Sequence, residues 1–153
     1  MQSLAEVIKK TTGKDITNYP GAGAAGGMGG GLLAFFNAEL KPGTELLLKA
    51  IDFSEKIKGA DLIITGEGKA DRQTAMGKVP YGILKEAQKE HIPVIVLAGS
   101  IENLPELNKA GFKGIFSIAP GPSPWRKTME PEFAKENITR LVSQLYSVIT
   151  SFG

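Results

Sequence analysis

Three short apolar runs alternate with amphipathic segments in the second half of the chain, and this alternation most constrains the fold. The runs are Leu62–Ile64, Val94–Leu97 and Gly114–Ile118. Strands buried on both faces consist of nearly continuous apolar residues, and helices between them return the chain in the parallel direction. We therefore expect an α/β fold, an open parallel sheet with helices on both faces, which corresponds to half of a Rossmann or flavodoxin-like domain.

The segments around these runs carry apolar residues at helical spacing. We expect helices over about Thr44–Gly59, over Pro80–Lys89 between the first two runs, and over about Glu132–Ser151 after the third. A short helix that Gly111 stops should link the second run to the third. These helices would cover the sheet.

The first 43 residues do not follow this rhythm. A helix beginning near Ser3 and ending at Gly13 precedes a glycine-rich tract, 21–31, and the apolar run Leu32–Phe36 then predicts a buried helix. We expect residues 1–43 to be a piece of a second α/β domain with a glycine-rich loop. Residues 44–153 should form the parallel-sheet domain, which is incomplete.

Composition excludes several classes of protein. With 153 residues and 42% hydrophobic content, the chain can bury a core and is not intrinsically disordered. Its net charge of +2 is too small for a nucleic-acid binder that depends on phosphate contacts. No apolar stretch approaches the length of a membrane span, and the absence of cysteine removes thiolate chemistry. We expect a cytoplasmic protein that binds neither nucleic acid nor a membrane.

Ligands of open parallel sheets bind beyond the carboxyl ends of the strands. Three loops occupy that position here: Gly66–Lys78, Gly99–Asn103 and Pro120–Arg126. The first is dense in carboxylates, cations, an amide and a hydroxyl, which suits an anionic substrate with a bound cation. The alternative is a solvated loop whose charges satisfy one another, and the residues alone leave both interpretations open.

The glycine tract contains the spacing Gly21-x-Gly23-x-x-Gly26, which formally matches a dinucleotide-binding fingerprint. That fingerprint requires a preceding strand, and the residues before Gly21 make a poor one, so we reject it. Successive backbone N–H groups could still form an anion-binding nest. Alternatively, the small residues allow close backbone packing or a hinge.

Two other nucleotide or hydrolase signatures are missing. Gly77-Lys78 is not part of a Walker A loop, because Arg72 stands where the leading glycine should fall. His91 is the single histidine and ends a polar helix, so a triad-type hydrolase has no base to use.

Several segments together resemble the bacterial glycerate kinase family. The resemblance is carried by Gly21–Gly27, Asp61–Thr74 and Gly77–Gly82, and more weakly by Pro93–Gly99 and Phe116–Ile118. It runs from about residue 19 to the carboxyl end. The combination of segments is specific.

The resemblance implies ATP-dependent phosphorylation of D-glycerate to a phosphoglycerate, with Mg²⁺, on a fold of two α/β domains. Family members are more than twice this length and carry amino-terminal segments that are absent here. The chain therefore looks like the carboxyl-terminal part alone. Arg72 departs from the family, which often has a small polar residue at that position.

The resemblance also implies site residues. Asp71 would orient or deprotonate the glycerate hydroxyl or hold Mg²⁺, with Glu67 as the second metal-binding carboxylate, and Lys78 would neutralise negative charge as the other catalytic residue. The expected substrate-binding residues are Gly66, Glu67, Gly68, Lys69, Gln73 and Thr74, and those expected to cradle an anion are Gly21, Gly23, Ala24, Gly26 and Gly27.

A hypothesis of another class remains open: the chain is a non-catalytic fragment or subunit that acts only as an anion-binding or assembly domain. Without an amino-terminal half, it would expose an apolar face and hide it against the missing half or in a homodimer. The run Leu32–Phe36 is a candidate for that surface.

Overall fold

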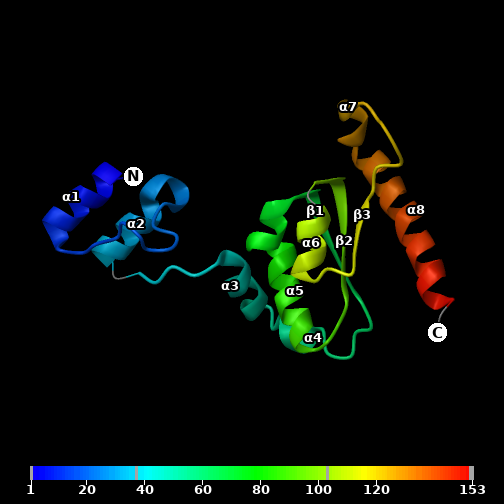
Figure 1. The fold of residues 1–153 in the computed structure, drawn as a ribbon, viewed down its shortest axis with the longest axis horizontal. Coiled ribbons are helices and arrows are strands. Elements are labelled where there is room, and N and C mark those ends of the chain that lie inside the picture. The colour runs from blue at the N-terminus through cyan, green and yellow to red at the C-terminus, as the bar shows by residue number, and fades with distance from the viewer. Residues whose placement is uncertain (1, 37, 103, 152–153) are drawn as a thin grey trace. The chain divides into compact units, whose positions relative to one another are not determined.

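The structure, a computed structural model, describes residues 2–36, 38–102 and 104–151. It divides into two compact units, Met1–Leu46 and Leu47–Gly153, and the division falls within helix α3 (Gly43–Ala50) (Figure 1). Each unit has its own buried cluster and is described by itself.

The first unit contains helices α1 (Gln2–Thr12) and α2 (Ala24–Phe36). Its small apolar core consists of Ala5, Ile8, Ile16, Ala22 and Ala34. The prediction of a helix over Leu32–Phe36 is correct. The prediction that this helix is buried is largely wrong, because Phe35 and Phe36 are 61% and 75% exposed. A cluster of five residues is too small to cover all sides of α2.

The second unit is built on a three-stranded sheet in the order β1-β2-β3. Strands β1 (Ile63–Ala70), β2 (Val94–Ile101) and β3 (Gly114–Ser117) are all parallel. The register pairs Ile63 with Val94 and runs on to Ala70 with Ile101. This arrangement confirms the predicted open parallel α/β sheet.

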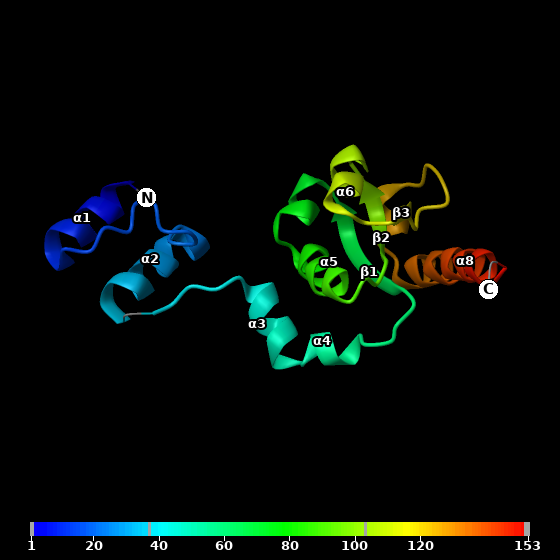
Figure 2. The ribbon, with the colours of Figure 1, turned by 60° about the horizontal axis from the view of Figure 1, so that its bottom comes forward.

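Helices cover both faces of this sheet. Views from two directions place α5 and α6 on one side and α8 on the other (Figures 1 and 2). The helical elements of this unit after α3 are α4 (Phe53–Lys56), the 3₁₀ helix η1 (Arg72–Met76), α5 (Val79–Lys89), α6 (Leu104–Ala110), α7 (Trp125–Thr128) and α8 (Pro131–Thr150).

The two faces of the sheet are buried to different degrees. On the α5 and α6 side, Leu84 and Leu107 pack with Val94 and Val96 in a core from which water is almost excluded. On the α8 side, the helix buries its apolar stripe only partly, and Ile138 remains 41% exposed. The expectation that the last helix covers the sheet is therefore only partly met.

The boundaries of several elements differ from the sequence-based expectation. Gly66 and Gly68, predicted to lie in a loop, belong to β1, because β2 continues beside this segment and pairs with Gly66, Glu67 and Lys69. The helix predicted over Thr44–Gly59 is broken at Asp52, which adopts a left-handed conformation with φ of 50°. Asn103, the end of the second predicted loop, lies outside the described residues.

Among the described helices, none is both long and apolar enough to cross a membrane.

Candidate functional site

Three charged side chains meet where β1 leads into α5. Lys78 Nζ lies 3.7 Å from Glu67 Oε1 and 3.6 Å from Asp71 Oδ1. Glu67 is on β1, Asp71 follows the strand directly, and Lys78 is the residue before α5. Both carboxylates therefore contact one ammonium group, and we call these three residues the charged cluster.

Helix η1 folds the intervening segment so that the cluster can form. Asp71 is its N-cap: the carboxylate accepts a hydrogen bond from the backbone N–H of Gln73 (2.9 Å). The helix ends at Gly77, whose φ of 115° is readily adopted only by glycine. This turn brings Lys78 back to the end of β1.

The Thr74 side chain contacts both acidic residues of the charged cluster. It is fully buried, accepts a hydrogen bond from the backbone N–H of Asp71 (3.1 Å) and lies 3.4 Å from Glu67 Oε2, to which its hydroxyl donates. Together with the Asp71 carboxylate it forms a reciprocal capping box. Thr74 thus holds the backbone of one acidic residue and the side chain of the other.

Asp71 is ionised at neutral pH. Burial raises the pKa of its carboxyl, but the backbone N–H of Gln73, the Lys78 ammonium and the backbone N–H of Thr74 outweigh burial and hold the pKa below its ordinary value of 3.8. A carboxylate with a low pKa is a weak proton acceptor and a good ligand for cations.

The charged cluster is accessible to a ligand. The side chains of Glu67 and Asp71 are each 20% exposed and that of Lys78 is 35% exposed. No group of three or more metal-ligating side chains occurs among the described residues. A pair of carboxylates nevertheless fits Mg²⁺, which proteins often hold through one or two carboxylates together with phosphate oxygens and water.

The other expected substrate-binding residues surround the cluster without joining it. The Lys69 ammonium forms an ion pair with Glu102 (2.8 Å) and with neither cluster carboxylate. Gln73 is exposed on η1, and the backbone of Gly66 and Gly68 is open to solvent. These assignments remain predictions.

Sequence reasoning missed the structural importance of Gly99 on β2. A Cβ atom at this position would lie 2.7 Å from the carbonyl oxygen of Gly68 on β1, so only glycine allows the two strands to approach here. The sequence places a glycine near the end of each strand, which could have indicated this close approach. Recognising it requires the register of the two strands, which the sequence alone does not give.

The glycine tract in the first unit forms a left-handed turn at Ala25, Gly26 and Gly27 before the regular part of α2. Later glycines pack closely: a Cβ atom at Gly29 would lie 2.4 Å from the carbonyl oxygen of Gly21. Close packing thus explains part of the tract. Anion binding by the expected residues 21, 23, 24, 26 and 27 remains a prediction.

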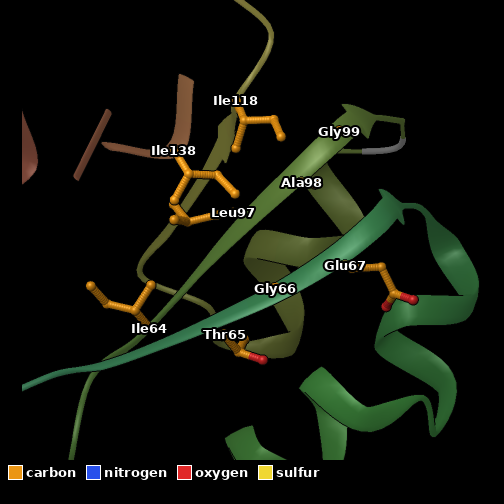
Figure 3. A pocket seen from close by; sticks show the side chains of 9 residues that line it. All are labelled: Ile64, Thr65, Gly66, Glu67, Leu97, Ala98, Gly99, Ile118 and Ile138. Carbon is orange, nitrogen blue, oxygen red and sulfur yellow. The ribbon is translucent and has the colours of Figure 1, made fainter. Parts of the chain in front are cut away.

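The opposite face of the sheet carries an apolar cavity of about 300 Å³. Figure 3 shows the side chains of Ile64, Leu97 and Ile138 on one side of β1 and the Glu67 carboxylate on the other. This follows from the alternation of side chains along a strand, since Ile64 and Glu67 are an odd number of residues apart. Glu67 also lines the cavity, so this residue borders both the cavity and the charged cluster.

Comparison with known protein families gives a match over nearly the whole chain. The family model described as "Glycerate kinase family" matches residues 1–150. The chain belongs to the glycerate kinase family. The charged cluster lies within two of the segments that carry the resemblance, Asp61–Thr74 and Gly77–Gly82.

Curated relatives of this glycerate kinase family chain are much longer. It is 46% identical over 118 residues to a glycerate kinase of Halalkalibacterium halodurans, covering 76% of this chain and 31% of the relative. It is 47% identical over 119 residues to the glycerate 2-kinase of Escherichia coli K12, and the match covers 77% of this chain and 31% of that relative. A Bacillus cereus glycerate kinase is 39% identical over 151 residues, and the match covers 97% of this chain and 39% of that relative.

The fold agrees with a solved structure of a protein assigned as glycerate kinase 2 from Salmonella typhimurium LT2. The TM-score is 0.70 at 33% identity, and the match covers 98% of this chain and 38% of that chain. The chain thus spans between about a third and two fifths of the length of these three relatives and of the solved structure. This agrees with the expectation of a carboxyl-terminal portion.

Proposed function

We propose that this chain supplies the carboxyl-terminal portion of an ATP-dependent glycerate kinase that phosphorylates D-glycerate. The observation that supports it most is the charged cluster, in which Lys78 lies between Glu67 and Asp71 at the carboxyl end of a parallel strand. Phosphoryl transfer needs positioning and charge neutralisation more than covalent chemistry. Two carboxylates and an ammonium can provide both.

In the proposed reaction, Asp71 orients the glycerate hydroxyl or holds Mg²⁺. Its depressed pKa favours these roles over proton abstraction. Mg²⁺, when bound with ATP through Asp71 and Glu67, would neutralise phosphate charge. Lys78 would move from its carboxylate partners to the glycerate carboxylate or to the transferred phosphoryl group. Thr74 keeps the two acidic residues in place.

The remaining assignments form part of the same proposal. Gly66, Gly68, Lys69 and Gln73 contribute contacts to the substrate, and the glycine-rich turn of the first unit cradles an anion. Residues 1–43 belong to a second domain and residues 44–153 form the incomplete sheet domain. The remainder of the family fold completes the active site, and the enzyme works in the cytoplasm, where ATP is available.

A coupled assay for phosphoglycerate formation from ATP and D-glycerate tests the proposal. The chain is assayed alone and after co-expression with the complementary part of the H. halodurans relative. We expect activity in the combined sample, and Asp71→Asn to lower kcat/KM by about 100-fold or more. Activity within about threefold of the unmodified protein would overturn the role of Asp71.

An active combined sample also separates this proposal from a purely non-catalytic role. If the combined sample binds ATP or glycerate but never turns over, the chain acts as a binding or assembly domain instead. Glu90→Gln is a matched control, because Glu90 is an exposed carboxylate at the end of α5 and lies outside the charged cluster. Its kcat/KM should stay unchanged.

A further inference from the structure

An apolar groove runs along the α8 side of β1. The cavity of about 300 Å³ beside Ile64 is followed by a second of about 270 Å³ that Ile64 also lines. We call the two together the α8 trough. Its apolar walls come from Leu97 and Ile118 on the sheet side and from Ile138, Val142, Leu145 and Ile149 on α8.

The trough is only partly covered. Ile64, the second residue of β1, is 45% exposed, and Tyr146 and Ile149 on α8 are 68% and 47% exposed. Large apolar side chains gathered in one groove are typical of a surface that contacts another polypeptide.

The outer edge of β1 borders this trough and is open. The backbone N–H of Ile63 donates to the carbonyl of Pro93 (2.9 Å), so the odd-numbered residues at the start of β1 direct their amides towards β2. The amides of Ile64 and Gly66 therefore point to the other edge. Within the described part of the chain, no strand pairs with that edge.

We propose that a β-strand from the part of the glycerate kinase fold outside these 153 residues pairs with the outer edge of β1 and places apolar side chains in the α8 trough. This proposal rests on the proposed function, because it takes the remainder of that fold as the partner. The relatives have polypeptide beyond the matched segment that can supply such a strand, because this chain covers only 31 to 39% of them.

An added strand satisfies both features at once. It provides carbonyl and N–H partners for the unpaired backbone of β1, and its alternate side chains point towards α8. A helix lying in the trough would leave the amides of Ile64 and Gly66 without partners. The walls are mainly apolar, although Thr65, Glu67 and Asp61 also line them, and this favours Val, Ile or Leu on the inward face of the added strand.

Hydrogen exchange tests the proposal directly. The chain is measured alone and after co-purification with the complementary part of the H. halodurans relative. We expect the amides of Ile64 and Gly66 to exchange quickly in the chain alone and to slow by about 100-fold or more in the complex. The amides of Ile63 and Thr65, already paired with β2, should change much less.

Each other outcome of this experiment overturns the proposal. Slow exchange of Ile64 and Gly66 in the monomeric chain would mean that the chain covers its own edge. Protection that grows with the concentration of the chain alone would identify a second copy as the partner. Unchanged exchange in the complex, or no co-purification, would mean that the complementary part does not dock there.

Variants give a second readout. Ile64→Asp and Tyr146→Asp should each weaken binding of the complementary part by about tenfold or more, because they place a charge in the trough. Leu104→Asp is the matched control: it is 44% exposed but starts α6, on the opposite face of the sheet. Circular dichroism confirms that each variant is folded, and equal binding by all three would overturn the proposal.

The hydrogen-exchange experiment distinguishes failure of the docking proposal from failure of the proposed kinase activity. If the amides of Ile64 and Gly66 become protected but no phosphoglycerate forms, the docking surface stands and the catalytic proposal falls. If activity appears without protection of these amides, the catalytic proposal stands and the partner docks elsewhere.

Discussion

The buried hydroxyl of Thr74 accepts a hydrogen bond from the backbone N–H of Asp71 at 3.1 Å, and the Asp71 side chain accepts one from the backbone N–H of Thr74 in return. The two residues thus cap η1 reciprocally and hold its first turn against the end of β1. The same Thr74 hydroxyl lies within 3.4 Å of Glu67. The position of the acidic pair therefore depends on a side chain that no ligand can reach.

Thr74→Val tests this dependence. The change keeps the shape of the side chain but removes the hydroxyl, which leaves buried backbone and carboxylate groups without a partner. We expect the free energy of unfolding to fall by about 1–3 kcal/mol, measured by urea denaturation. Thr150→Val is the control, because the Thr150 hydroxyl donates to a backbone carbonyl at the exposed end of α8. Its free energy of unfolding should change by less than about 0.5 kcal/mol.

Lys78→Met tests the role of the ammonium group in the assembled enzyme. Methionine retains the length of the side chain and removes the charge that would neutralise the substrate, so we expect kcat/KM to fall by about 100- to 1,000-fold. Lys109→Met on the exposed side of α6 is the control. Equal activity of the two variants would show that Lys78 is a surface cation only.

The titration of Asp71 is a third prediction. Because its pKa in the folded chain lies below the ordinary value of 3.8, ionised Asp71 stabilises the folded state above that pH. This contribution is lost as the pH falls through the lower pKa of the folded state. NMR titration of the carboxyl carbon measures it directly.

In Lys78→Met, the same titration should shift upwards. The variant removes one of the groups that lower the pKa of Asp71, whereas the backbone N–H of Gln73 remains. An identical titration curve in the variant would mean that Lys78 does not act on Asp71 in solution.

Gly99→Ala and Gly68→Ala form a matched pair on neighbouring strands. A Cβ atom at Gly99 would lie 2.7 Å from the Gly68 carbonyl oxygen, whereas one at Gly68 would meet nothing within 4 Å. We expect Gly99→Ala to lower the free energy of unfolding by about 1–3 kcal/mol and Gly68→Ala to have little effect. Thermal denaturation of both variants checks this difference, and equal melting temperatures would contradict the close approach of β1 and β2.

The sequence by itself determined the fold class of the second unit. The continuous apolar runs at Leu62–Ile64 and Val94–Leu97 predicted parallel strands, because strands covered on both faces consist of nearly continuous apolar residues. It also located the charged residues, since polar side chains that follow a buried strand fall at the carboxyl edge of the sheet. The family resemblance came from the same segment, Asp61–Thr74.

Only the tertiary structure decided which of these residues meet. Gly66 and Gly68 lie within β1 because strand pairing with β2 compensates for their weak preference for strands, and η1 turns Lys78 back to Glu67 and Asp71. The direction of the Lys69 ammonium towards Glu102 and the exposure of Ile64 likewise depend on contacts between distant segments. Local sequence specifies the elements, but the contacts between side chains depend on register and packing, which arise from residues far apart along the chain.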